Sequence, residues 1–231
     1  MRPTTPNVHF TPPPTDILWL VVDSVVEPEY HLLPKFDDQA RVRRATLHAC
    51  ALVCKGMLQR AMYHLYNDIP LYDHWRASLF ARTMAERCEL APLVRHLSLG
   101  LGQCLSEEED DFRMPLPSDV VVLLSNLYSL TLDGESEWPG MRPEALDFAK
   151  LFAASCPSLD KLVLTRLEFE SFVDFVGLVW SFPRIRHLAM SRVFIPRTDV
   201  GMPVGGDDDL TKSLIESTRL NDLTSLIVRN Y

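Results

Sequence analysis

The sequence predicts a protein of the α/β class, with an N-terminal module of three helices followed by an irregular solenoid of alternating helices and short strands. Two observations predict this fold. Residues 16–66 contain three helical segments rich in apolar side chains. From residue 66 onward, a short leucine-centred phrase recurs five times, with helical stretches between the copies. We therefore expect a flexible leader over residues 1–12, a helical module over 13–71 and a repeat region over 72–231.

Composition and charge restrict the class of protein. Hydrophobic residues make up 47% of the chain and charged residues 23%, which is typical of a soluble globular protein. A net charge of -8 argues against sequence-independent nucleic-acid binding, which needs a basic surface. No apolar run approaches the roughly 20 residues that span a bilayer, and residues 1–14 carry five prolines without the apolar segment of a secretory signal. We expect a cytoplasmic or nuclear protein that binds neither nucleic acid nor membrane.

The first predicted helix lies over residues 16–26. Pro14 suits a helix start, because an N–H at that position has no partner within the helix, and Asp16 complements the positive end of the helix dipole. The segment is apolar at Ile17, Leu18, Trp19, Leu20, Val21, Val22, Val25 and Val26. A helix apolar on so many sides must be buried on more than one side, so we expect one side to face another protein chain.

Two further helices complete the predicted module. Residues 27–38, with two prolines, predict a loop, and residues 41–55 return to helical spacing. We expect Gly56 to end that helix and a third amphipathic helix to run from Met57 to Leu65. A unit this small is marginally stable alone, and a bound partner would stabilise it.

The repeat region is defined by a phrase of the form apolar-x-x-Leu-x-apolar. Its central leucines are Leu97, Leu130, Leu162, Leu188 and Leu226. Their positions differ by 33, 32, 26 and 38 residues, and helical stretches are predicted over 75–88, 119–124, 144–154, 170–181 and 208–217. We expect Trp180 to lie in the core and Trp138 at the surface.

A strand and a helix recurring at this interval resemble a leucine-rich repeat of a degenerate type, because the spacing exceeds the usual ~20–29 residues and the consensus Asn or Cys is missing. The alternative is an ordinary α/β sheet with helices on both faces. The chain stops directly after the fifth phrase and leaves a strand edge without a cap. This is also the pattern expected of a shortened chain.

Two segments of the helical module carry a family resemblance: Pro14-Thr15-Asp16-Ile17-Leu18, and Ala49-Cys50-Ala51-Leu52-Val53-Cys54-Lys55. Over about residues 12–71 the chain resembles the F-box, in the F-box-like form common in fungal proteins. It departs from the family at Pro13, where a leucine is usual, and at Met57, where a tryptophan is usual.

The resemblance implies a substrate-recognition adaptor of a Skp-cullin-F-box type ubiquitin ligase. The F-box would bind the Skp-type adaptor and thereby the cullin ligase, and the repeats would bind an unknown protein substrate. Carried over by the resemblance, the adaptor-binding residues are Pro14, Ile17, Leu18, Val21, Val22, Leu52, Val53, Cys54 and Leu58. The alternative is a repeat-type protein-binding scaffold that recruits no ligase.

No motif in the sequence predicts an enzyme. Gly100 and Gly102 suggest a dinucleotide-binding fingerprint, but its third glycine is missing. His96 and His187 occupy equivalent positions in two repeats, which accounts for both histidines without a catalytic role. An α/β hydrolase or transferase would require a cluster of His, Asp and Ser around a deep pocket. The five cysteines are scattered and odd in number, so we expect free thiols, with no metal and no cofactor.

Overall fold

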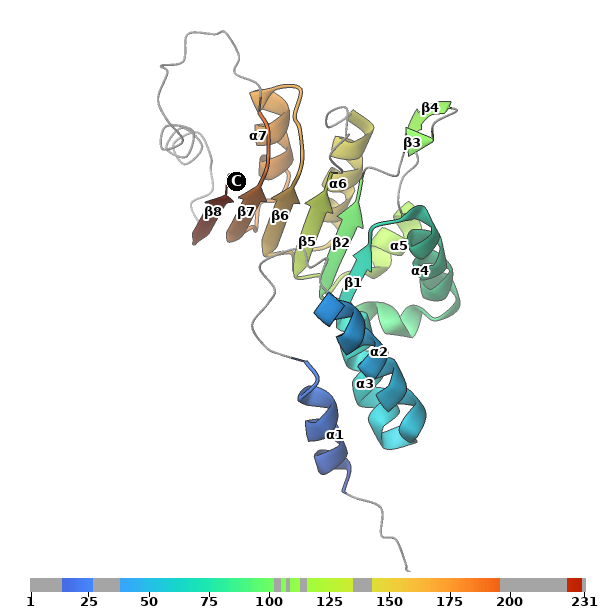
Figure 1. Cartoon of the computed structure of the whole chain (residues 1–231). Helices are drawn as coiled ribbons and strands as arrows, with labels where there is room; N and C mark the ends of the chain where they lie inside the picture. The colour runs from blue at the N-terminus through green and yellow to red at the C-terminus, as the bar shows by residue number, and fades with distance from the viewer. Residues whose placement is uncertain are drawn as a thin grey trace, which may run out of the picture. The chain divides into compact units, whose positions relative to one another are not determined.

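A computed structural model describes residues 14–26, 38–101, 105–106, 109–112, 116–134, 143–195 and 224–229 (Figure 1). It is a mixed α/β structure that divides into two compact units, Met1–Leu65 and Tyr66–Tyr231. Within the described ranges, none of the helices is both long and apolar enough to cross a bilayer. The leader, most of the 27–38 loop, the helix expected over 208–217 and Trp138 lie outside the described residues.

The three predicted helices are α1 (Thr15–Asp23), α2 (Asp38–Val53) and α3 (Lys55–Asn67), and the first unit contains all of them except the last two residues of α3. Helix α1 begins directly after Pro14 and has Asp16 in its first turn, as its sequence predicts. The break between α2 and α3 falls at Cys54 rather than at Gly56, which lies inside α3. A Cβ atom at Gly56 would come within 3.2 Å of Leu18 Cδ1, so the missing side chain permits close approach of α1.

The second unit is built on a six-stranded parallel sheet in which all the arrows of Figure 1 point the same way. Its strands are β1 (Asp68–Leu71), β2 (His96–Gly100), β5 (Ser129–Asp133), β6 (Lys161–Thr165), β7 (His187–Ser191) and β8 (Ser225–Arg229). The strand order β1-β2-β5-β6-β7-β8 follows the chain order. A separate two-stranded pair, β3 (Leu105–Ser106) and β4 (Glu109–Phe112), was not predicted.

The leucine phrase sets the register of the sheet. Leu97 pairs with Leu130, Leu130 with Leu162, Leu162 with Leu188, and Leu188 with Leu226. The first four of these side chains are at most 1% exposed. Because side chains alternate across a strand, the residues between the leucines lie on the opposite face of the sheet. The five predicted strands are therefore confirmed, and they are adjacent and in register.

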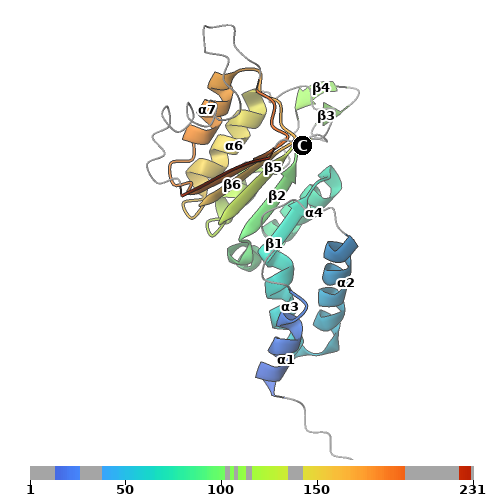
Figure 2. The same cartoon turned by 60° about the vertical axis from the view of Figure 1, so that its left-hand side comes forward.

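The helices of this unit are α4 (His74–Glu86), the 3-10 helix η1 (Cys88–Leu93), α5 (Ser118–Leu123), α6 (Pro143–Ser155) and α7 (Phe172–Trp180). Contacts run from α4 to α5, from α5 to α6 and from α6 to α7. Figure 2 shows α6 and α7 together on one face of the sheet. The helices thus form a single row in chain order, and four of the five predicted helical stretches are found close to their predicted ends.

Two further sequence expectations differ from the structure. Residues 68–71 were assigned to the helical module, yet they form β1 at the edge of the sheet, in register with β2. The leucine phrase does not identify β1, because Ile69 stands in the position of its central leucine. The strand accommodates Pro70 because it lies at the edge of the sheet. Trp180 is 51% exposed and does not lie in the core, because it is the last residue of α7 and faces solvent.

Candidate functional site

The predicted adaptor-binding residues of α1 are distributed between surface and core. Ile17 is 52% exposed and Val21 is 48% exposed, Pro14 is exposed, and Leu18 is half-buried. Val22 is fully buried, so its side chain is unavailable to a partner and its assignment to the binding face is corrected. The two adjacent valines differ because successive helical residues point about 100° apart.

The second predicted segment is more exposed than the first. Leu52 is 89% exposed and Val53 is 69% exposed at the end of α2, Cys54 is exposed, and Leu58 on α3 is 40% exposed. Removing a leucine side chain from water stabilises an association by about 1.5–3 kcal/mol. These side chains therefore favour burial against another protein.

Sequence reasoning missed one member of this surface. Leu20 is 68% exposed, and it lies three residues after Ile17 and one before Val21. The i, i+3, i+4 spacing of these three residues places them on one side of α1. This spacing can be read from the sequence, and it would have identified Leu20 as a member of the same surface. We call the exposed aliphatic side chains of Ile17, Leu20, Val21, Leu52, Val53 and Leu58 the apolar flank.

The apolar flank is exposed although the unit has buried apolar residues of its own. Leu47 is 3% exposed, Met57 and Leu65 are each 7% exposed, and Ala61 and Val22 are inaccessible. Met57, which stands where the F-box resemblance leads us to expect a tryptophan, is thus buried.

Contacts between α1 and the start of α3 bring together the two segments that carry the sequence resemblance. The Trp19 indole Nε1 donates a hydrogen bond to the Gly56 carbonyl oxygen at 3.1 Å. Leu18 lies against the same glycine, which follows Leu52 by only four residues. The N-terminal part of α1 and the corner between α2 and α3 therefore lie side by side.

A polar cluster holds the other end of α1, and we call it the Asp23 clasp. The Arg60 guanidinium donates to both Asp23 oxygens, and His64 Nε2 lies 2.7 Å from Asp23 Oδ1. The hydrogen bond from Arg60, with a smaller one from His64, lowers the pKa of Asp23 below its usual value despite partial desolvation. Arg60 also lies over the Trp19 and Tyr63 rings, at 5.9 and 5.1 Å from their centroids.

The second unit contains a buried ion pair at the C-terminal ends of its strands. Asp133 on β5 is 1% exposed and accepts two hydrogen bonds from Arg166, at 2.9 and 2.8 Å. Burial raises the pKa of Asp133, and Arg166 opposes that rise. Arg166 directly follows β6 and has a φ of 54°, in the left-handed region. This backbone conformation directs its side chain back toward the neighbouring strand. The pair links successive strands and has the character of a structural contact.

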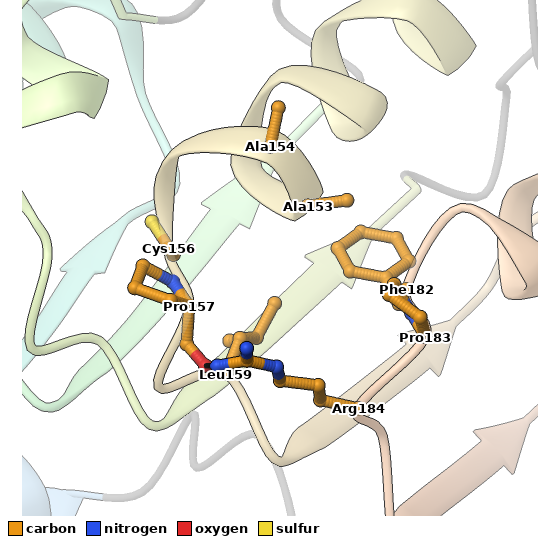
Figure 3. Close-up of a pocket in the computed structure, with 8 residues that line it drawn as sticks. All are labelled: Ala153, Ala154, Cys156, Pro157, Leu159, Phe182, Pro183 and Arg184. Carbon is orange, nitrogen blue, oxygen red and sulfur yellow. Dashed lines mark hydrogen bonds between the residues drawn. The ribbon is translucent and has the colours of Figure 1, made fainter.

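A small cavity lies between the end of α6 and the segment that leads into β7 (Figure 3). Its volume is about 230 Å³, and most of its lining is apolar. Burial raises the pKa of the Cys156 thiol to about 12, so this lining thiol stays protonated. Arg184 donates to the Pro157 carbonyl oxygen at 3.0 Å. The cavity lacks the convergent His, Asp and Ser that the hydrolase alternative requires.

Among the described residues, no group of three His, Cys, Asp or Glu side chains is placed to hold a metal ion. No family model matches the sequence, and no curated protein matches it.

Proposed function

We propose that this chain is a substrate-recognition adaptor of a Skp-cullin-F-box type ubiquitin ligase. In this proposal the N-terminal helices bind a Skp-type adaptor, which connects the chain to the cullin ligase. The repeat region, a leucine-rich-repeat-like solenoid, binds the protein to be ubiquitinated. The chain itself performs no catalysis.

The apolar flank is the observation that carries the proposal. Leu52 and Val53 are largely exposed at the corner between α2 and α3, and the contacts of Leu18 and Trp19 with Gly56 hold α1 beside that corner. These are the two segments on which the F-box resemblance depends. An interface in which a few large aliphatic side chains are buried fits this arrangement.

The sheet supports the second half of the proposal. Its parallel strands follow chain order, its helices form one row, and equivalent leucines of successive strands pair in register. A repeat structure of this kind offers an extended strand surface to a partner protein.

Co-purification with the Skp-type adaptor and the cullin tests the proposal. Ile17→Asp and Leu52→Asp place a charge in the apolar flank and should each reduce recovery of both partners about tenfold or more, since an unpaired buried charge costs several kcal/mol. Val42→Asp is the matched control, because Val42 is also on α2 and 65% exposed but outside the apolar flank. Unchanged recovery with both flank variants would disprove adaptor binding through this surface.

A second candidate function is a repeat-type scaffold that binds proteins without recruiting a ligase. The burial of Met57 favours it, because the position where the F-box has a tryptophan offers no exposed aromatic side chain. Folded wild-type chain that binds a partner protein but no adaptor would select this function.

A further inference from the structure

We infer that the N-terminal edge of the parallel sheet binds an acidic, extended segment of a partner protein. This deepens the proposed function by giving the chemistry of the protein substrate. It rests on the proposed function only in identifying the bound segment as part of a substrate of the ligase. The surface is the edge cluster, formed by Arg95, His96, Tyr128, Asp160, Arg186 and His187.

Repetition of the backbone puts these residues in one line. Each member occupies either the residue just before a strand or the first residue of that strand, in β2, β5, β6 or β7. The carbonyl oxygens of Arg95, Tyr128 and Asp160 each accept two N–H groups from the next repeat. These carbonyl oxygens are therefore already hydrogen-bonded within the sheet, so a partner would be recognised by the side chains.

The side chains of the edge cluster contact one another across the strands. The His96 and Tyr128 rings meet edge to face, with centroids 6.0 Å apart. Asp160 lies 3.6 Å from Arg186 Nε and 3.6 Å from His187 Nε2. Both separations exceed a hydrogen bond, so Asp160 holds neither group tightly and an incoming carboxylate can compete for them.

Exposed charge along this line is mainly positive, in contrast to the chain's net charge of -8. Arg95 is exposed and the Arg186 side chain is 64% exposed, whereas the Asp160 side chain is only 17% exposed. Arg184, two residues before Arg186, adds another exposed guanidinium. Beyond β2, the first residue of β1 is the acidic residue Asp68, so the row of positively charged side chains ends there.

Charge complementarity therefore selects an acidic partner, and the geometry selects an extended one. Neighbouring strands are ~4.8 Å apart, so β2 to β7 spans about 14 Å, the length of four or five extended residues. Arginine and tyrosine are also among the side chains enriched at the energetic centre of protein interfaces. Tyr128, at 39% exposure between the two exposed arginines, provides such an aromatic contact.

Fluorescence anisotropy on the intact chain without adaptor tests this inference. The probe is a labelled eight-residue peptide of glutamate and serine, and its neutral counterpart has glutamine in place of glutamate. We expect the glutamate peptide to bind in low salt and to be released at about 1 M NaCl, where the screening length is ~3 Å. The neutral peptide should bind at least about fivefold more weakly.

Substitutions locate the binding surface. Arg186→Gln should weaken binding about fivefold, and the Arg95→Gln/Arg186→Gln double variant should weaken it further, while Arg186→Lys should retain most of the affinity. Arg82→Gln is the control, because Arg82 is 69% exposed but lies on helix α4 and is not a member of the edge cluster. Unfolding temperatures establish that each variant is folded.

Equal binding of the two peptides, or wild-type affinity in the folded double variant, would overturn the inference. Because no adaptor is present, these outcomes are independent of the substitutions that test adaptor binding through the apolar flank.

Discussion

Asp23 of α1 and Arg60 of α3 form a two-bond ion pair, with Nε to Oδ1 at 2.6 Å and the second nitrogen to Oδ2 at 2.9 Å. The two residues are 37 positions apart, the same separation as Trp19 and Gly56, which share another polar contact between these helices. The constant offset means that α1 and α3 run side by side in the same direction. One side of α1 is thereby anchored, and Ile17, Leu20 and Val21 remain exposed.

Removing the charge of the Asp23 clasp should loosen α1. Asp23→Asn keeps the shape of the side chain but loses the ion pair, and we expect a cost of about 1 kcal/mol or less, because the Asp23 side chain is 35% exposed and screened. Hydrogen–deuterium exchange of α1 peptides would measure it as faster exchange. Asp147→Asn, at an exposed pair on α6, is the control and should leave α1 exchange unchanged.

The Asp23 clasp should also weaken in acid. The pKa of Asp23 is lowered in the folded state, so its contribution is present above the unfolded value of about 3.9 and is lost as the pH falls through the folded value. The Trp19 indole N–H signal, followed by NMR during acid titration, should report this loss. An unchanged titration in Asp23→Asn would show that another group is responsible.

Gly134 should tolerate no side chain. A Cβ at this position would lie 2.2 Å from the Arg166 carbonyl oxygen, so Gly134→Ala must displace backbone, and we expect it to lower the free energy of unfolding by about 3 kcal/mol. Gly177→Ala is the matched comparison, since Gly177 lies in α7 with open space around it. That variant should gain about 0.5–1 kcal/mol in urea unfolding. Equal effects of the two substitutions would contradict the close approach.

Loss of Arg166 should destabilise the second unit in a pH-dependent way. Arg166→Ala leaves Asp133 buried without its partner, which costs about 3 kcal/mol near neutral pH. Burial then raises the pKa of Asp133 further, so the penalty should shrink as the pH falls and the carboxyl group becomes protonated. Urea unfolding at pH 7 and at pH 5 measures the difference, and a pH-independent penalty would contradict it.

Cys156 should resist alkylation while the chain is folded. Its pKa of about 12 leaves almost no thiolate at pH 8, whereas Cys54 and Cys88 are exposed to reagent. Mass spectrometry after brief iodoacetamide treatment should find Cys54 and Cys88 modified and Cys156 intact. In urea all three should react, and rapid labelling of Cys156 in the folded protein would contradict its burial.

Much of the architecture could be predicted because it depends on local periodicity. The leucine phrase identified five strands, and these leucines align in register because each needs the same buried position beneath the helices. The helical segments around Ile17, Leu52 and Met57 were predictable because their apolar residues are concentrated at helical spacing.

The sequence by itself determined most of the helices, five strands of the parallel sheet, their order along the chain and the apolar character of the candidate docking segments. Tertiary structure alone decided that Val22 is buried beside the exposed Val21, that Ile69 begins the sheet, and that Asp23 meets Arg60. These facts depend on contacts between residues far apart in the chain. Periodicity along one segment fixes which side chains share a face, but only the packing of other segments determines which face is covered.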